Sequence, residues 1–428
     1  MDRRLQNRYR TIVKQQVQAA QALAAGLHAL PGAPSSFAAT QAAWRFLNNP
    51  RVGLPQLVEP LREAGRQAAA ASTATHLLLI QDWSFLSFPT HTSKADRLCQ
   101  GAEHALGYDL ATALLVDGGT GQPLAPMDLE LTTQTGVISS RADRPPDQPA
   151  GPHIDQVLAT MTAAATWGLA RPVVHVIDRE ADGLAQFRTW ASAGHQFVVR
   201  VDADRRVRWR DQSRRLPEIV AGLRAESAFR PVGPLGPSRT LFVAETTIAY
   251  TQPGRVRRGQ RRLSVPGEPL AVRLVVSQVR DPGGAVIAEW LLVTNVGPEV
   301  SAARVGQWYA WRWRIESFFK LLKSHGQQVE QWQQETGAAI AKRLAVTAMA
   351  CVLVWQVVRD TTPHGQRAAE LLVRLSGRQV KRARPVTAPA VLAGLEKLLG
   401  VLDLLDETTV EELRQLLHRV LAGLGGSG

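Results

Sequence analysis

Three carboxylates that lie far apart in the sequence could together perform phosphoryl-transfer chemistry. Asp82 closes the apolar run HLLLIQD, Asp178 closes the apolar run PVVHVID, and Glu316 lies within a helical pattern further along the chain. Carboxylate oxygens are hard ligands that suit Mg²⁺ or Mn²⁺. Two such ions about 3.5–4 Å apart would activate an attacking oxygen and stabilise a leaving one. The three acids are therefore candidate ligands of a two-metal site.

The first of these acids has competitors. Asp117 and Asp128 lie on neighbouring predicted strands, so either could take the place of Asp82. An aspartate at the end of a strand also more often stabilises a turn than takes part in catalysis. Asp178 follows a fully apolar, buried strand, and the carboxyl end of such a strand is a common place for chemistry in an α/β sheet.

The third acid lies in the stretch WYAWRWRIESFFKLLK, residues 308–323, for which we predict a single amphipathic helix. Its polar residues fall on one face, which we expect to be exposed: Tyr309, Arg312, Glu316, Lys320 and Lys323. Its apolar residues fall on the opposite face, towards the core: Trp308, Trp311, Ile315, Phe318 and Leu322. An ordinary solvated helix face, with arginine and lysine pairing to the glutamate, has the same pattern.

The overall charge points to a polyanionic partner. The formal net charge is +13 and the isoelectric point is near 10.6, with far more arginine than lysine. Arginine suits bidentate phosphate contacts, although a GC-rich genome would also raise its frequency. Two cysteines exclude a disulfide framework or a cysteine zinc site and suit a reducing, cytoplasmic compartment. The N-terminus lacks a signal peptide pattern, and the apolar run 345–358 is too short to span a bilayer, so we expect a buried helix and no membrane partner.

The remaining pattern predicts an α/β protein flanked by helical segments. A basic helical N-terminal segment is a candidate DNA-binding unit or a structural cap, and a Leu-rich helical C-terminal segment is a candidate dimerisation element. Between the second aspartate and the glutamate lies an Arg-rich, β-rich insertion with two basic loops, suited to phosphate contacts or to solvated edge strands. The predicted segments are 1–70 (helical), 71–201 (core, first part), 202–289 (insertion), 290–360 (core, second part) and 361–428 (helical).

Four motifs together resemble one family. The spacing Tyr309-x2-Arg312-x3-Glu316-x6-Lys323 is similar to the Y-x2-R-x3-E-x6-K signature of bacterial DDE transposases of the insertion-sequence-four type, the cut-and-paste group. The segments ATQAAWRFLNNP (39–50), IDREAD (177–182) and EWLLVTN (289–295) resemble the same family. The resemblance implies a ribonuclease-H-like catalytic core with a β-rich insertion, and Asp82, Asp178 and Glu316 as ligands of two Mg²⁺ or Mn²⁺ ions. One departure is Trp83, where many relatives carry a small polar residue.

The resemblance also implies DNA contacts. Tyr309 and Arg312 would contact DNA near the cleaved end, and Lys320 and Lys323 would hold phosphates. Trp290 matches a tryptophan that in some members stacks on a base flipped out during hairpin formation, although an inward core tryptophan is equally compatible. Arg200 resembles a further DNA-contacting arginine.

The implied partners are terminal inverted repeats, target DNA and a second copy of the chain. Two alternatives stay open: a ribonuclease-H-like nuclease without transposition activity, and a non-catalytic DNA-binding relative.

Overall fold

The computed structural model describes residues 1–18, 36–100, 104–142, 151–236, 238–258, 261–323, 326–378 and 386–424. The chain folds as two compact units, each built from separate stretches of sequence. The sheet unit comprises Val58–Leu86 and Asp96–Ser317, and the helical unit comprises Met1–Leu57, Ser87–Ala95 and Phe318–Gly428. The five predicted segments stay a prediction.

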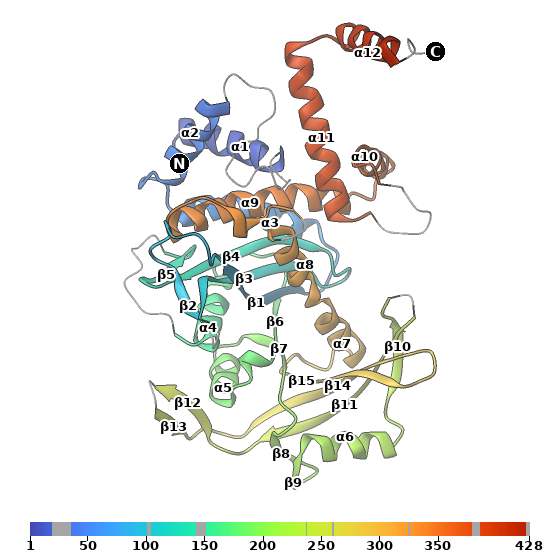
Figure 1. Cartoon of the computed structure of the whole chain (residues 1–428). Helices are drawn as coiled ribbons and strands as arrows, with labels where there is room; N and C mark the ends of the chain where they lie inside the picture. Colours follow the sequence, from blue (N-terminus) through green and yellow to red (C-terminus); the bar gives the residue numbers. More distant parts are fainter. Residues whose placement is uncertain are drawn as a thin grey trace. The chain divides into compact units, whose positions relative to one another are not determined.

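The sheet unit is built on a mixed sheet of thirteen strands in the described part of the chain, in the order β5-β4-β3-β1-β6-β7-β15-β14-β11-β8-β9, with β2 on β3 and β10 on β11 (Figure 1). The strands before the insertion are β1 (Leu77–Ser87), β2 (Leu98–Gln100), β3 (Ala105–Asp117), β4 (Pro123–Thr133), β5 (Gly136–Ser139), β6 (Val173–Ile177) and β7 (Gln196–Arg200). The insertion adds β8 (Arg206–Trp209), β9 (Gln212–Arg215), β10 (Arg230–Pro234), β11 (Thr240–Tyr250), β14 (Leu270–Arg280) and β15 (Val286–Thr294).

The middle of this sheet is parallel and apolar. β1 pairs with β6, and β6 with β7, in parallel. The first residues of β1, Leu77 to Ile80, are fully buried, as expected for a strand covered on both faces. β15 then pairs antiparallel with β7, from Val198 opposite Thr294 to Arg200 opposite Leu292. The residues of β15 that pair with β7 belong to the predicted second part of the core, and they leave β7 without an exposed edge.

Helices pack on this sheet and place the site residues. They are most of α3 (Leu54–Ala71), α4 (His153–Ala164), α5 (Leu184–Ser192), α6 (Leu216–Ala225), α7 (Ala302–Trp311) and the start of α8 (Trp313–Leu322), with the 3-10 turn η2 (Arg179–Ala181) after β6. α5 buries Phe187 and Trp190 against Phe197 of β7 in a cluster of aromatic contacts. Truncating a buried aromatic of this size costs about 3–5 kcal/mol, so this cluster holds the strand that follows the second aspartate.

A separate two-stranded ribbon leaves the sheet beside α5 (Figure 1). It consists of β12 (Gly254–Arg258) and β13 (Arg261–Val265). Arg188 of α5 holds together the two segments that lead into and out of the ribbon. Its guanidinium donates hydrogen bonds of 2.8 Å to Gln252 O and to Glu268 O. A Cβ atom at Gly254 would lie 2.8 Å from Ala185 Cβ, so a glycine is needed where the ribbon meets the helix.

The helical unit is organised around one long buried helix. It contains α1 (Arg3–Gln18), α2 (Ser36–Leu47), the 3-10 turn η3 (Val329–Gln331), α9 (Gly337–Arg359), α10 (Pro363–Leu375), α11 (Ala388–Glu407) and α12 (Val410–Leu424). α9 is long and apolar enough to cross a membrane by length and composition, but 78% of its most apolar window is buried inside the protein. It packs against α1 and α11. The predicted buried helix at 345–358 is thus confirmed as part of α9.

Candidate active site

Asp82 and Asp178 lie on two adjacent parallel strands at the same level of the sheet. The pairing of β1 with β6 runs from Leu77 opposite Val173 to Gln81 opposite Ile177. Each aspartate is the next residue along the chain after the last pair, so the register brings the two close together. Asp178 follows the end of β6, as predicted. Its carboxylate caps η2 by accepting a hydrogen bond of 3.0 Å from the Glu180 N–H.

The prediction that Asp82 ends its strand is wrong. β1 continues to Ser87, and the aromatic residues Trp83 and Phe85 that follow the aspartate suit a strand. What ends before Asp82 is the parallel pairing with β6. The carboxylate therefore still lies where the two strands part, which is the geometry that the prediction required of it.

The Arg312 guanidinium reaches all three predicted acids. Its Nη1 atom lies 2.6 Å from Asp82 Oδ2. Its Nη2 atom lies 3.6 Å from Asp178 Oδ2 and 4.0 Å from Glu316 Oε1. Only the first distance is that of a hydrogen bond. Strands β1 and β6 and helix α8 thus bring three carboxylates from distant parts of the sequence around one cation.

The predicted single helix over residues 308–323 is wrong, because it breaks at Arg312. α7 ends at Trp311 and α8 begins at Trp313. At the break the Arg312 N–H bonds to Tyr309 O at 3.0 Å, and the Ile315 N–H bonds to Arg312 O at 3.1 Å. This three-residue spacing is that of a tighter 3-10 turn.

The expectation that the polar face is exposed is wrong for two of its residues. Tyr309 is 2% and Arg312 is 7% exposed, because these side chains face the acids and Trp290. The apolar face is confirmed, with Trp308 and Ile315 fully or almost fully buried.

The turn between β3 and β4 holds this helix junction. The Trp308 indole donates a hydrogen bond of 2.8 Å to Gly118 O, and Arg314 donates one of 2.9 Å to Gly121 O. Gly121 has a φ of +71°, and a Cβ atom there would lie 2.5 Å from the Trp311 ring, so only glycine fits. The backbone of this turn thereby fixes the end of α7 and the position of Arg312, which follows it.

The two competing aspartates have structural partners instead. Asp117 builds the β3–β4 turn, since its Oδ1 atom accepts hydrogen bonds from the Gly119 N–H at 2.9 Å and the Thr120 N–H at 2.7 Å. Asp128 is 2% exposed and pairs with Arg141. Of the three candidates for the first acid, Asp82 is the one that meets Asp178 and Glu316 at a common cation.

The electrostatics of the cluster favour an additional cation. Burial raises the pKa of the Asp82 carboxyl to about 6, although Arg312 and the Trp83 N–H act in the opposite direction. Glu316 and Asp178 add to the rise because like charges repel. Burial alone would lower the pKa of Arg312, but the surrounding acids hold it above its ordinary value. Three carboxylates with one guanidinium leave an excess of negative charge.

The donor set fits a hard divalent cation. Carboxylate oxygens that converge without sulfur or nitrogen ligands suit Mg²⁺ or Mn²⁺. As the side chains stand, no three acidic, histidine or cysteine residues of the described ranges are close enough together to hold one ion. The cation that the three carboxylates approach in this structure is the Arg312 guanidinium.

A chain of contacts leads from Arg312 to two further predicted residues. The Tyr309 ring meets Trp290 of β15 edge-on, with centroids 5.3 Å apart and planes inclined at 61°. Burial raises the pKa of the Tyr309 phenol, while Arg312 and Arg200 act against the rise. Arg200 ends β7 opposite Leu292, one strand from the tryptophan. The structure thus gathers Tyr309, Arg312, Trp290 and Arg200 near the acids.

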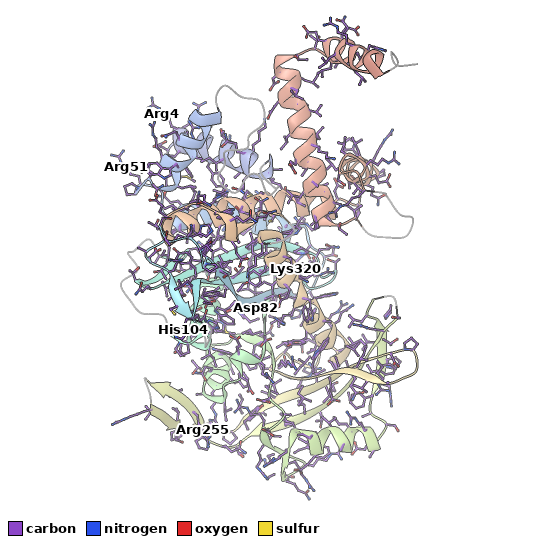
Figure 2. All side chains as sticks on the ribbon, in the orientation of Figure 1. Arg4, Arg51, Asp82, His104, Arg255 and Lys320 are labelled. Carbon is purple, nitrogen blue, oxygen red and sulfur yellow. The ribbon has the colours of Figure 1, made fainter. Side chains whose placement is uncertain are left out.

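The two predicted lysines belong to the helical unit. Lys320 is exposed on α8 (Figure 2). Lys323 follows that helix and pairs with Glu330 at 3.5 Å within the same unit. Their predicted part in phosphate binding stays a prediction.

Several residues beside the acids were missed from the sequence. His153 stacks on Trp83 and contacts Asp109 and Glu180. The only signal in the sequence is the bulky Trp83 directly after Asp82. A histidine at the start of a helix carries no such signal by itself.

Comparison with known proteins identifies the family of the chain. Residues 73–353, about two thirds of the chain, match the family model described as a transposase DDE domain. The cryo-EM structure of a piggyBac transposase synaptic complex with hairpin DNA is similar over 82% of this chain, with a TM-score of 0.36 and 11% identical residues. This chain covers 57% of that chain, and a likeness so weak carries no conclusion about mechanism. On the match over residues 73–353, the chain belongs to the family of transposases with a DDE domain.

Proposed function

We propose that this chain is a cut-and-paste DNA transposase of the insertion-sequence-four type, in which Asp82, Asp178 and Glu316 are the catalytic residues. The observation that carries the proposal is the convergence of these three carboxylates on Arg312 within a DDE-domain chain. Its substrates are the inverted repeats at the ends of a transposon and a target DNA. Its site of action is the bacterial nucleoid.

The three acids would hold two Mg²⁺ or Mn²⁺ ions. Such ions polarise phosphodiester oxygens and generate an activated water or hydroxyl nucleophile. The chain's own contribution is positioning. The parallel register of β1 and β6 fixes the spacing of the two aspartates, and the β3–β4 turn fixes the helix junction that carries Arg312 towards them. Arg312 limits the repulsion among the carboxylates in the absence of metal.

A ribonuclease-H-like core is the fold that we propose for the first half of the sheet unit. Three antiparallel strands, β1, β3 and β4, are followed along the chain by β6 and β7, which extend the sheet in parallel from β1. This order supports the proposal, because Asp82 lies on β1 and Asp178 directly follows β6, the strand next to it. The insertion then follows the second aspartate, as the family resemblance implies.

DNA binding is supported by the charge of the insertion. The ribbon sequence GRVRRGQRRLSV (254–265) carries five arginines and no acid. Its register sets Arg257 opposite Arg262 and Arg258 opposite Arg261. A strand pair with five arginines and no acid has no counter-charge of its own, so its composition suits an anionic partner. We infer that the partner is the phosphate backbone of duplex DNA.

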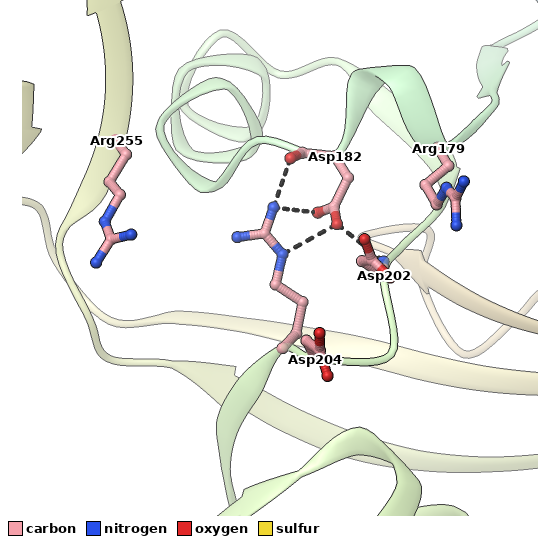
Figure 3. Close-up of a pocket in the computed structure, with 6 residues that line it drawn as sticks. Arg179, Asp182, Asp202, Asp204 and Arg255 are labelled. Carbon is pink, nitrogen blue, oxygen red and sulfur yellow. Dashed lines mark hydrogen bonds and ion pairs between the residues drawn. The ribbon is translucent and has the colours of Figure 1, made fainter. Parts of the chain in front are cut away.

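The ribbon and the turn that follows β6 line one recess. An opening of about 710 Å³ is lined by Arg179, Asp182, Asp202, Asp204, Arg205 and Arg255 (Figure 3). Asp182 and Arg205 pair with each other at 2.8 Å. Within the described part of the chain, Arg179 and Arg255 have no ion pair, and Arg179 directly follows Asp178. The ribbon's first arginine and the residue directly after the second aspartate therefore line the same recess.

The remaining predicted residues complete the proposal. Trp290 would stack on a flipped base in a hairpin intermediate, with Tyr309 behind it. Arg200, Lys320 and Lys323 would contact phosphates. Because two transposon ends must be held together, the active form would be a homodimer on DNA, for which the helical C-terminal segment is the candidate interface.

The test is an excision and strand-transfer assay with Mg²⁺ on DNA bounded by the element's own ends. We expect end cleavage and joining to target DNA with the native chain. Glu316→Gln should abolish both reactions and leave binding of the ends nearly unchanged, whereas Glu299→Gln, an exposed acid of the same unit, should behave like the native chain. Cleavage without strand-transfer products would instead identify a nuclease. Cleavage that persists in Glu316→Gln would remove the proposed catalytic role.

A further inference from the structure

One histidine touches the neighbours of both aspartates. His153, the first residue of α4, makes two hydrogen bonds through its ring. Its Nε2 atom lies 2.6 Å from Asp109 Oδ2, and its Nδ1 atom lies 2.6 Å from Glu180 Oε2. Both partners are carboxylates, which accept hydrogen bonds, so both ring nitrogens donate and the ring is an imidazolium. A single side chain thus connects β3 with the turn that follows β6.

The same ring holds Trp83. The indole lies flat on the imidazolium, with ring centroids 4.5 Å apart and planes within 2° of parallel. The Trp83 Nε1–H donates a hydrogen bond of 2.8 Å to Gln156, which lies one turn after His153 on α4. A cation on the face of an indole is attracted by the ring electrons. Two residues of the first turn of α4 therefore hold Trp83 in place, His153 by ring stacking and Gln156 by a hydrogen bond.

Two of the three residues that His153 contacts, Trp83 and Glu180, are bonded in turn to the proposed catalytic aspartates. The Trp83 N–H donates to Asp82 Oδ1 at 3.0 Å. The Glu180 N–H donates to Asp178 Oδ1, also at 3.0 Å. The imidazolium is thus one residue removed from both carboxylates, and Asp109, which is 7% exposed on β3, anchors it from behind.

We propose that His153 is a positioning residue, which sets the orientation and separation of the Asp82 and Asp178 carboxylates for divalent cation binding. This inference rests on the proposed function, because it takes these two aspartates to be metal ligands. Partners of this kind, one step removed from a metal, fix the ligands in place, and their loss commonly weakens metal affinity about 10–100-fold.

A simpler role would be to neutralise the buried Asp109 carboxylate. One ring nitrogen suffices for that. Neutralising Asp109 requires neither the contact with Glu180 nor the parallel stack with Trp83. The Glu180 side chain is 59% exposed and needs no partner. The carboxylates on both sides also keep the ring charged: burial would lower the pKa of His153, but Asp109 and Glu180 raise it to about 9.

The experiment measures Mn²⁺ binding directly on the full chain, by the electron paramagnetic resonance signal of the free ion, alongside cleavage as a function of Mn²⁺ concentration. For His153→Gln we expect the apparent dissociation constant for Mn²⁺ to rise about 10–100-fold, while saturating Mn²⁺ restores most of the cleavage rate. His104→Gln is the matched control, since His104 is an exposed histidine of the same unit, and it should bind Mn²⁺ like the native chain.

A second variant covers the case in which His153→Gln does not fold. Glu180→Ala keeps the contact between His153 and Asp109 and removes the contact between His153 and Glu180. This variant should therefore fold and should bind Mn²⁺ several-fold more weakly. Folded variants that bind Mn²⁺ with native affinity would overturn the inference and leave the proposed function standing. A native chain that binds no Mn²⁺ and cleaves no DNA would overturn both.

Discussion

The Arg312 guanidinium lies 2.6 Å from the Asp82 carboxylate, so this buried acid already has a cationic partner. The same guanidinium reaches Asp178 and Glu316 at 3.6 and 4.0 Å. The metal ions that we propose would therefore compete with Arg312 for the same oxygens. We expect the metal-free protein to depend on Arg312 for stability and metal to take over part of that role.

Replacing this arginine should expose the competition. For Arg312→Ala, without metal at pH 7.5, we expect a loss in the free energy of unfolding on the order of 3 kcal/mol, because the buried Asp82 carboxylate loses its partner. Mg²⁺ should raise the melting temperature of this variant more than that of the native chain. Arg314→Ala is the control: among the described residues that arginine bonds to a backbone carbonyl and to no acid, so Mg²⁺ should not recover its loss. If Mg²⁺ raised the melting temperature of all three proteins equally, the proposed competition between Arg312 and metal would be wrong.

Trp290 should act at a single step of the reaction. It is half-buried against Tyr309, which leaves part of the indole available to a flipped base. For Trp290→Ala we expect the first nick to persist and hairpin product to fall about 10-fold or more, since stacking on one base contributes about 1–3 kcal/mol. Tyr309→Phe keeps the ring contact and should retain the hairpin. Product analysis on denaturing gels separates the steps, and normal hairpin yield from Trp290→Ala would restrict this tryptophan to the core.

The ribbon should account for part of the salt dependence of DNA binding. Arg255 and Arg261 are exposed on opposite strands of it. In the double variant Arg255→Gln/Arg261→Gln, the slope of log affinity against log salt should flatten by about 0.9 for each phosphate that the ribbon no longer neutralises. Arg210→Gln is the control within the insertion, because Arg210 is already neutralised by Glu226 at 2.6 and 2.9 Å. An unchanged slope in the double variant would show that the ribbon does not bind phosphate.

Local patterns in the sequence point to candidate residues but not to their arrangement. The run that ends at Asp178 is apolar and stops with the strand, so its position could be predicted from residues 172–178 alone. The run around Asp82 continues as a strand, and only the pairing with β6 shows why that position is special. Register between distant strands depends on tertiary contacts, which no local pattern contains.

The helix break at Arg312 had no local signal either. WRWRIE contains neither glycine nor proline, and its 3.6-residue periodicity suits an unbroken helix. The break follows from contacts with the β3–β4 turn, where Gly121 admits the Trp311 ring, and from the reach of Arg312 to Asp82. His153 was missed for the same reason, since its partners come from three separate elements.

The charge on His153 should make part of the protein's stability depend on pH. The pKa of His153 is raised from 6.5 to about 9 in the folded chain. A raised pKa means that the folded state binds the proton more tightly, so the stabilisation is complete below about pH 6.5 and is lost as the pH rises towards 9. A shift of this size corresponds to at most about 3 kcal/mol, and we expect on the order of 2 kcal/mol because the ring is partly solvated. The difference in the free energy of unfolding between the native chain and His153→Gln, from urea denaturation without metal, should therefore shrink between pH 6 and pH 9.5. The His104→Gln control should show no such trend, and a difference for His153→Gln that stays constant over this range would mean that the ring is not the charged brace between Asp109 and Glu180.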